Sequence, residues 1–337
     1  MHLPPIPPYI ADMQKILVTG ANGFVGAAVL GELEQRGLCY TAAVRSLAGA
    51  GMAGALAPRF VPVGDISRAT DWSAALAGCS SVIHLAARAH VLRDTDANPL
   101  AAFRHTNVEG SVQLAMSARR AGVKRFVFVS SVGVNGSHNT RAFTEGDTPQ
   151  PDEDYAISKL EAEMALQHEL AGGPTELVIV RPPLVYGPGC PGNFLRLLKL
   201  LSSRVPLPFG AFEARRSFVG VENLANFLVT CTLHERAAGE VFLVSDMDDV
   251  ALPELLRLLA VGMERSAPIF SFPPAVLGMA ARMLGKGAMF DKLCSELTVD
   301  ATHALRTLDW RPPVLLAEGL RLTGRWYAQS LVDMPPS

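Results

Sequence analysis

The sequence predicts an α/β fold, with a doubly wound parallel sheet followed by a smaller C-terminal lobe. Short apolar runs alternate with longer helical stretches through the first half of the chain, which is typical of a parallel sheet covered by helices. The runs are apolar at nearly every position, as in Phe126-Val127-Phe128-Val129, so both faces of each strand are expected to be buried. A chain of 337 residues is long enough to bury the core that such a sheet needs.

The apolar runs and their boundaries predict the individual elements. Strands are expected at 15–19, 40–44, 59–63, 81–85, 125–129 and 177–180, and helices at 24–36, 99–121 and 153–170. The first helix ends before Gly37, because glycine readily adopts the left-handed conformation that closes a helix. Proline and glycine become dense between 187 and 210, where the alternation of strands and helices loosens.

These boundaries divide the chain into three parts. Residues 1–12 are rich in proline and lack the basic and apolar regions of a signal peptide, so they are interpreted as an N-terminal extension. Residues 13–182 form the first domain. Residues 183–332 form the smaller lobe, interleaved with that domain and closing over the carboxyl ends of its strands, where ligands of open α/β sheets bind.

The most apolar late stretch, 275–284, is interrupted by Arg282 and is shorter than the roughly 20 residues that span a bilayer. No integral membrane segment is therefore expected. We expect a buried helix over this stretch, the alternative being a helix that lies on a membrane surface.

Composition narrows the classes of function. The apolar fraction of 49% and charged fraction of 18% are those of a globular protein. A net charge of −2 provides no basic surplus for nucleic acid. The five cysteines are scattered without a CxxC pair, which argues against a metal or disulfide framework and suits a reducing compartment such as the cytoplasm.

A glycine-rich turn after the first strand indicates a dinucleotide site. Gly20 permits a tight turn, Gly23 lets the backbone approach a pyrophosphate, and Gly26 allows close packing of helix on sheet. Phe24 and Val25 complete the turn and begin a helix whose N-terminus would face the phosphates. The alternative is a glycine turn without a ligand.

The ends of the second and third strands bear on the choice of cofactor. No acidic residue lies between Glu34 and Asp65, so the carboxylate that holds the ribose 2′-hydroxyl of NAD is missing. Arg45 at the end of the second strand suits a 2′-phosphate, which predicts NADP with NAD as the alternative. Otherwise, Arg45 stacks on adenine or faces water. Asp65 and Ile66 follow the third strand, where the carboxylate accepts from the adenine amino group or caps a helix.

Tyr155 and Lys159 are the candidate catalytic pair. They are four residues apart in a predicted helix, so both side chains lie on one face. An ammonium beside a phenol stabilises the phenolate and lowers a tyrosine pKa from about 10 toward operating pH. Ser131, at the end of the fifth strand, would hydrogen-bond the reacting oxygen, and no metal is needed. The chain has 24 arginines and six lysines, so arginine is its usual positive residue and a lysine at 159 indicates a specific role. The alternative is an exposed tyrosine beside a surface lysine.

In this order, the features resemble the extended branch of the short-chain dehydrogenase/reductase family, from about residue 15 to 327. Further motifs support the resemblance: His84-Leu85-Ala86-Ala87, Asn107-Val108-Glu109-Gly110-Ser111, Arg181-Pro182-Pro183-Leu184-Val185-Tyr186-Gly187-Pro188, Asp300, Leu308-Asp309-Trp310-Arg311-Pro312 and Glu318-Gly319-Leu320-Arg321. The last three are similar to the closing motif of nucleotide-sugar epimerases and reductases. The resemblance implies a Rossmann-type NAD(P)-binding domain, a substrate-binding lobe and a homodimer.

The resemblance also implies roles for individual residues. Ala86, Ala87 and Asn107 would lie near the cofactor, and Lys159 would contact the nicotinamide ribose. In themselves, the alanines are packing residues and Asn107 is a polar residue of a helix. The two residues that would hold the diphosphate of a UDP-sugar are Asn193 and Arg216, the latter through its planar guanidinium. Without the family, Arg216 is a solvated arginine.

Two reactions at C4 of a UDP-hexose remain open. Val132-Gly133 stand where dehydratases of the family carry an Asp-Glu pair, which disfavours loss of water. Asn135-Gly136 in place of the Tyr-Gly of epimerases, together with Arg45, favours a 4-keto reductase that makes sugars for surface polysaccharide. The alternative is a UDP-glucose or UDP-N-acetylglucosamine 4-epimerase. Two further alternatives are a non-catalytic cofactor-sensing regulator and a flavonoid- or steroid-type reductase.

Overall fold

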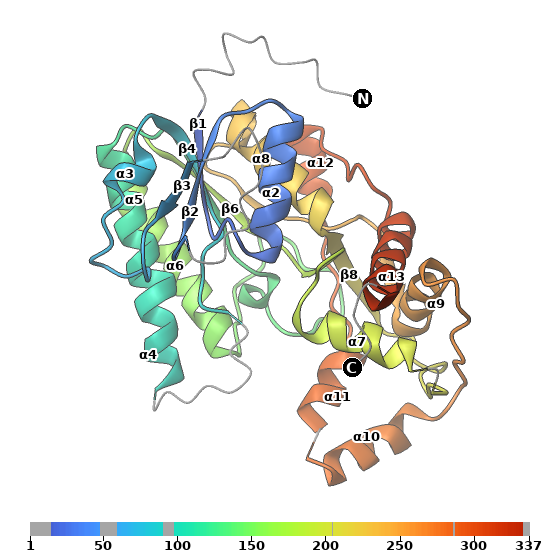
Figure 1. The fold of residues 1–337 in the computed structure, drawn as a ribbon. Helices are drawn as coiled ribbons and strands as arrows, with labels where there is room; N and C mark the ends of the chain where they lie inside the picture. The colour runs from blue at the N-terminus through green and yellow to red at the C-terminus, as the bar shows by residue number, and fades with distance from the viewer. Residues whose placement is uncertain (1–14, 48–58, 90–97, 204, 286, 333–337) are drawn as a thin grey trace.

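The computed structural model describes residues 15–47, 59–89, 98–203, 205–285 and 287–332. The predicted extension at 1–12 lies outside these residues. The molecule consists of a larger lobe around a parallel sheet and a smaller lobe that contains the last helices (Figure 1).

Seven parallel strands form the central sheet, in the order β3-β2-β1-β4-β5-β6-β9. The strands are β1 (Lys15–Thr19), β2 (Tyr40–Val44), β3 (Arg59–Pro62), β4 (Cys79–His84), β5 (Arg125–Val129), β6 (Glu176–Arg181) and β9 (Val241–Leu243). The predicted doubly wound parallel sheet is confirmed. Sequence patterning missed β9, a three-residue strand that pairs with β6 and returns the chain to this sheet after a long excursion.

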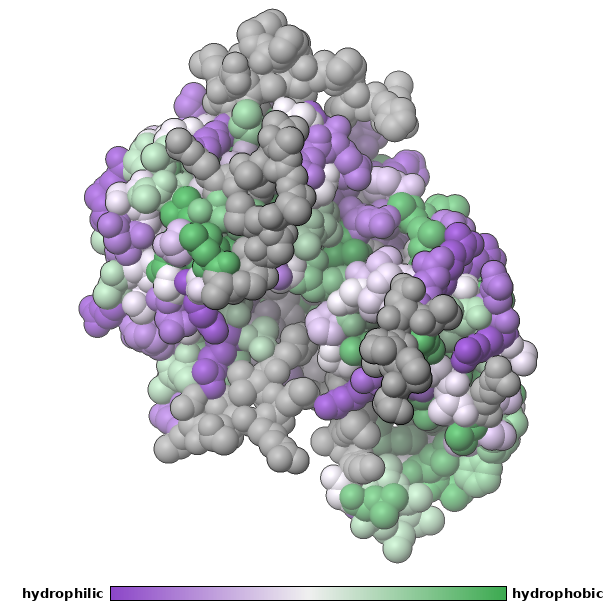
Figure 2. Space-filling view, viewed as in Figure 1, coloured by the Kyte–Doolittle hydropathy of each residue, from purple (hydrophilic) through white to green (hydrophobic). Residues whose placement is uncertain are grey.

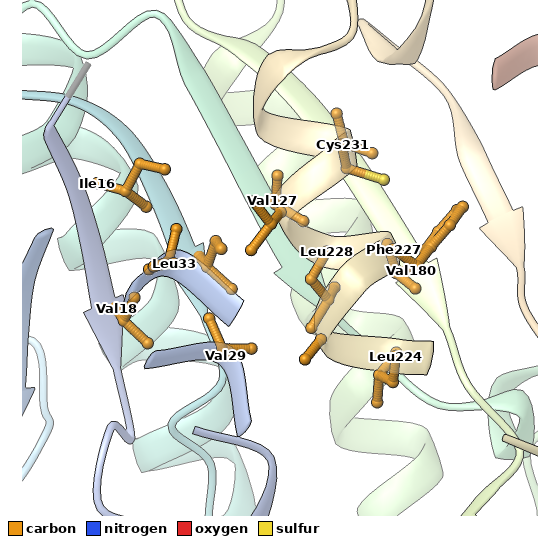
Figure 3. Close-up of a cluster of buried hydrophobic side chains, with 14 of the residues drawn as sticks. Ile16, Val18, Val29, Leu33, Val127, Val180, Leu224, Phe227, Leu228 and Cys231 are labelled. Carbon is orange, nitrogen blue, oxygen red and sulfur yellow. The ribbon is translucent and has the colours of Figure 1, made fainter. Parts of the chain in front are cut away.

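Alternate side chains of each strand enter two separate cores, one on each face of the sheet. Ile16 and Val18 of β1 pack with α2 (Phe24–Gln35) and α8 (Val221–Leu233), as Figure 3 shows. Leu17 faces the other way, toward α3 (Ser73–Leu76), α5 (Gly110–Arg120) and α6 (Asp154–Leu170). Burial on both faces explains the continuous apolar strands.

The single helix predicted over 99–121 is wrong in detail. The chain forms α4 (Pro99–Phe103), a π-helical segment at Arg104–Glu109 and then α5. Wide turns of this kind recur at functional sites because they redirect one side chain out of the helical register. Here, the redirected segment contains Asn107.

The smaller lobe has a sheet of its own, in the order β10-β8-β7. Its strands are β7 (Leu184–Tyr186), β8 (Arg215–Gly220) and β10 (Asp249–Ala251). Its helices are α7 (Gly192–Ser202), α9 (Leu252–Gly262), α10 (Pro274–Met283), α11 (Gly287–Cys294) and α13 (Leu316–Val332), while α12 (Thr302–Leu308) packs near β9.

The buried helix predicted over 275–284 is wrong. This stretch forms α10, in which Gly278 is buried but Val276, Met279 and Met283 are exposed. The helix lies at the periphery of the smaller lobe, so α11 covers only one of its sides (Figure 1). None of the described helices is both long enough and apolar enough to cross a membrane.

Two glycines let α9 and α13 pack backbone against backbone. A Cβ added at Gly262 would lie 2.1 Å from the carbonyl oxygen of Arg321, and one added at Gly324 would lie 2.2 Å from that of Leu259. Both distances are far below van der Waals contact, so any side chain at either position would force the helices apart.

Replacing Gly324 by alanine is therefore expected to lower the free energy of unfolding by about 1–3 kcal/mol, the usual cost of overpacking. Gly31→Ala in α2 is the control, because an added Cβ there meets no atom within 4 Å. That variant should gain up to about 1 kcal/mol from helix propensity. Urea unfolding followed by circular dichroism measures both, and effects of the same sign would contradict the packing argument.

Candidate active site

The glycine-rich turn forms a tight cradle at the carboxyl end of β1. Gly20 has a φ of +65°, and a Cβ there would lie 3.0 Å from the backbone nitrogen of Ala86. A Cβ at Gly26 would lie 2.2 Å from the carbonyl oxygen of Gly20, so the turn closes only with glycine at this position. Gly23 precedes α2 without any side-chain cap. The first turn of α2 thus presents backbone N–H groups, which suit the pyrophosphate of a dinucleotide.

A buried histidine fixes the strand ends around this cradle. The His84 ring lies 2.7 Å from the Thr19 hydroxyl and 2.9 Å from that of Ser111. Since Ser111 donates its only proton to the carbonyl of Asn107, His84 must donate from Nε2 and accept at Nδ1. Burial and the nearby Lys159 ammonium lower the pKa of His84 to about 3, so the ring is neutral.

Thr19 links His84 to the backbone that follows β4 through hydrogen bonds. Its hydroxyl donates to His84 and accepts from the N–H groups of Leu85 and Ala86, each at 3.1 Å. The segment containing Ala86 and Ala87 is thereby held against Gly20. Sequence reasoning gave His84 no role, although a histidine at the end of an apolar strand was a usable signal.

Asn107 links the same segment to the candidate catalytic helix. Its buried amide accepts from the backbone nitrogen of Arg88 at 2.8 Å and donates to the Arg88 carbonyl and the Ser158 hydroxyl. Ser158 lies next to Lys159 in α6. Every hydrogen bond of Asn107 is thus used to hold protein to protein, which makes it a positioning residue in this structure.

The Arg45 and Asp65 side chains meet at the edge of the cradle. The Arg45 Nε lies 2.8 Å from an Asp65 carboxylate oxygen, and the two side chains are 80% and 85% exposed. Such an exposed pair is weak and leaves both groups accessible to a ligand. Ile66 instead packs against α5, since a Cβ at Gly110 would lie 2.5 Å from its Cγ2.

Tyr155 and Lys159 lie on one face of α6, where Lys159 is buried and Tyr155 is partly buried. Burial raises the pKa of Tyr155 to about 12, contrary to the expectation that Lys159 lowers it. Burial also lowers the pKa of Lys159 to about 7, while the Glu163 carboxylate opposes that shift. The Lys159 ammonium lies 4.0 Å from the centre of the Phe128 ring, a favourable position for a cation.

Ser131 lies next to the turn that packs on the first part of α6. It precedes a single 3-10 turn at Val132–Val134, and its hydroxyl accepts from the backbone nitrogen of Gly133. That turn packs on α6 so closely that a Cβ at Gly133 would lie 3.2 Å from the Cβ of Ala156, the residue after Tyr155. The neighbouring Ser130 hydroxyl is buried and has no hydrogen-bond partner among the described residues, so it fits a polar ligand group.

A buried ion pair between Arg181 and Glu163 lies one helical turn from Lys159. Arg181, at the end of β6, donates to both carboxylate oxygens of Glu163, at 3.0 and 2.5 Å, and donates to Asn135 as well. Glu163 is one helical turn beyond Lys159. Sequence reasoning missed this pair, although an arginine closing an apolar strand was its signal.

The two candidate diphosphate residues belong to the smaller lobe. Arg216 of β8 is partly buried and donates to the Ser295 carbonyl at 3.0 Å. Burial lowers its pKa, so a solvated surface arginine does not describe it. Asn193 lies in the first turn of α7, and its side chain is outside the described part of the structure.

Comparison with known proteins agrees with this geometry. The model of the NAD dependent epimerase/dehydratase family matches residues 16–245. A UDP-glucose 4-epimerase from Vibrio cholerae is 39% identical over 94% of this chain and 96% of its own. An N-acetyl-α-D-glucosaminyl-diphospho-ditrans,octacis-undecaprenol 4-epimerase from Escherichia coli O157:H7 is 27% identical over 92% and 94%. The crystal structure of a UDP-glucose 4-epimerase with UDP-glucose from Thermotoga maritima superimposes with a TM-score of 0.74 at 25% identity, covering 94% of this chain and all of that one.

The buried lysine predicts an unusual pH dependence of stability. An unfolded lysine has a pKa near 10.5, whereas that of Lys159 in the folded protein is about 7. Below pH 7, both states are protonated and folding bears the full cost of burying the charge. Between pH 7 and 10.5, the unfolded state binds more protons, so stability rises with pH.

Lys159→Met, which has no charge to bury, should be more stable than the wild type at pH 6, with a difference that shrinks as pH rises through this window. Urea unfolding at a series of pH values measures the difference. Lys199→Met, which removes an exposed lysine on α7, should show no such trend. A difference for Lys159→Met that does not vary with pH would contradict the burial argument.

Proposed function

Because the chain belongs to the NAD dependent epimerase/dehydratase family and is an NAD(P)-dependent enzyme of the short-chain dehydrogenase/reductase type, we propose that it acts at C4 of a UDP-hexose. The observation that carries the proposal is the partly buried Tyr155 and the buried Lys159 on one face of α6, with Ser131 in the turn that packs on this helix. The glycine cradle, Ala86, Ala87 and the Arg45–Asp65 edge would hold the cofactor. When bound, the cofactor supplies or accepts the hydride.

The chain's own residues manage the oxygen and its proton. Ser131 accepts from the Gly133 nitrogen and donates its own proton toward the C4 oxygen, which polarises a carbonyl. Tyr155 gives its phenolic proton to that oxygen as the carbonyl becomes an alcohol, or takes it in the reverse direction. Lys159 stabilises the phenolate left on Tyr155.

The first candidate reaction is reduction of a 4-keto sugar in surface-polysaccharide synthesis. A tyrosine whose pKa burial raises to about 12 is held protonated at neutral pH, which is the form that donates to a reduced carbonyl. Asn135 stands where epimerases of the family carry tyrosine and accepts a hydrogen bond from Arg181, which supports the same reaction. The second candidate is a 4-epimerase, which the 39% identical relative from Vibrio cholerae favours.

The substrate is held by its diphosphate. Arg216 and Asn193 are the candidate ligands, and the guanidinium of Arg216 matches phosphate through its planar donors. The relatives from Vibrio cholerae and Escherichia coli are both named for sugars attached through a diphosphate. That shared group supports recognition of the diphosphate by this lobe.

The reductase proposal is tested with a UDP-4-keto-6-deoxyhexose and NADPH, following loss of NADPH absorbance. The wild type should oxidise NADPH, and Tyr155→Phe should lower kcat by about 10²–10⁴-fold, the usual value of a general acid, while still binding cofactor. Tyr40→Phe, which removes a hydroxyl bonded to Glu34 far from the site, should leave kcat unchanged.

Interconversion of C4 epimers of a UDP-hexose without net consumption of cofactor, by protein that retains tightly bound NAD, would select the epimerase instead. If neither reaction occurs with any of several UDP-hexoses, the proposed chemistry at C4 fails. An unchanged biological activity of Tyr155→Phe would favour a cofactor sensor.

We further propose that NADP is the preferred cofactor through Arg45. The Arg45→Ala variant should bind NADPH about tenfold more weakly, equivalent to about 1.4 kcal/mol, and should bind NADH almost as the wild type does. Fluorescence titration measures both affinities, with Arg120→Ala on α5 as a control. Tighter binding of NADH than of NADPH by the wild type would overturn the preference, and Asp65, whose negative charge lies beside Arg45, would be the reason.

A further inference from the structure

We propose that α10 docks the smaller lobe onto an anionic membrane surface. The inference is separate from the proposed reaction, since it rests on a surface outside the site. Six exposed apolar residues form what we call the apolar patch: Phe270, Phe272, Val276, Met279, Met283 and Leu284. Figure 2 shows hydrophobic side chains gathered over the α10 end of the smaller lobe. Exposed apolar patches of this kind mark interaction sites.

Three residues of the patch form an aligned stripe on α10. Val276, Met279 and Met283 are spaced three and four residues apart, which places them on one face of α10. The opposite side is anchored in the protein. Gly278 lies against Phe290 of α11, where an added Cβ would be 3.0 Å from the ring, and Phe290 in turn packs on Phe212. The helix is therefore fixed in place while its apolar face remains uncovered.

The charge of the segment that contains the patch favours an anionic surface. Residues 265–292 contain four basic residues and one acidic residue, in a chain whose net charge is −2. The single acidic residue, Asp291, forms an exposed ion pair with Arg282, which offers little stability of its own and leaves the arginine accessible. An apolar helix face preceded by phenylalanines, in a basic segment, is typical of helices that lie in the plane of a bilayer containing anionic lipids.

The same charges argue against a second copy as the occupant. A symmetric pair joined through this patch would bring the 265–292 segments of both copies, each with four basic residues and one acidic residue, together across a two-fold axis. Like charges facing each other in that way would weaken the pair, whereas anionic headgroups would neutralise them. Lipid therefore satisfies both the apolar stripe and its flank.

The position of the patch gives docking a consequence for the site. Ser295 directly follows α11 and accepts a hydrogen bond from Arg216, the candidate diphosphate ligand. The residue after α11 thus connects the α10–α11 pair to β8, the strand proposed to bind the substrate. Docking would place the smaller lobe, rather than the central sheet, at the membrane (Figure 1).

Co-sedimentation with lipid vesicles tests the proposal, using the full-length protein and vesicles of phosphatidylcholine with or without phosphatidylglycerol. The wild type should bind the anionic vesicles at least tenfold more tightly than the neutral ones, and high salt should weaken the binding. The double variant Met279→Glu with Leu284→Glu should lose at least tenfold in vesicle affinity.

A matched double variant serves as the control. Met164 and Leu315 are 61% and 73% exposed, against 59% and 73% for Met279 and Leu284, and they lie outside the patch. Met164→Glu with Leu315→Glu should bind vesicles as the wild type does, and both double variants should keep wild-type activity on a soluble substrate.

Three results would overturn the proposal. The wild type could fail to bind anionic vesicles, or both double variants could lose affinity equally. A wild type that ignores vesicles but falls to a smaller mass in analytical ultracentrifugation when Met279 and Leu284 are replaced would assign the patch to a second copy. Because vesicle binding and activity are measured separately, loss of one does not depend on the other.

Discussion

The burial of the Lys159 ammonium is the constraint on which the site depends. A buried cation is tolerated only where nearby groups offset the loss of water. Here, the ring of Phe128 lies under the ammonium and the Glu163 carboxylate is one helical turn away. Without Arg181, Glu163 would itself be an uncompensated buried charge. Arg181, at the end of β6, donates hydrogen bonds to both of its carboxylate oxygens. Burial of this candidate catalytic lysine therefore requires compensating side chains on two neighbouring strands, Phe128 near the end of β5 and Arg181 at the end of β6.

A second network places the backbone where a cofactor would lie. His84, Thr19 and Ser111 fix the turn after β4 from one side, and Asn107 fixes it from the other while reaching Ser158 beside the lysine. Each of these polar groups forms its hydrogen bonds with other protein groups, because an unpaired buried donor or acceptor would destabilise the fold. His84 stays neutral, since burial disfavours the charged ring and the nearby Lys159 ammonium would repel it. The candidate site is therefore organised by neutral hydrogen bonds near the glycine turn and by the Glu163–Arg181 ion pair near Lys159.

Local patterns in the sequence could predict most of the sheet and could name the candidate residues of the site. Continuous apolar runs predict the buried strands, and the spacing of the glycines predicts the tight turn. Three features could not be predicted in this way. β9 has three residues and is defined by its pairing with β6, the π-helical turn around Asn107 has no periodic signature of its own, and the exposure of α10 depends on which neighbour covers it. The raised pKa of Tyr155 was also missed, because burial is a property of the packed structure and acts against the ammonium four residues away.

The glycine turn of the larger lobe contacts the core of the smaller lobe. Phe24, the first residue of α2 and part of the glycine turn, packs against the hydrophobic core of the smaller lobe. In that core, Tyr186 donates to Asp246 at 2.7 Å, and a Cβ at Gly319 would lie only 2.4 Å from the Tyr186 hydroxyl. Asp246 also accepts from the Gly220 nitrogen at the end of β8, the strand that begins with Arg215 and Arg216. A movement of the glycine turn on binding a dinucleotide would therefore be felt by the core that supports Arg216, so binding at the two lobes is expected to be coupled through packing rather than through the long loops between them.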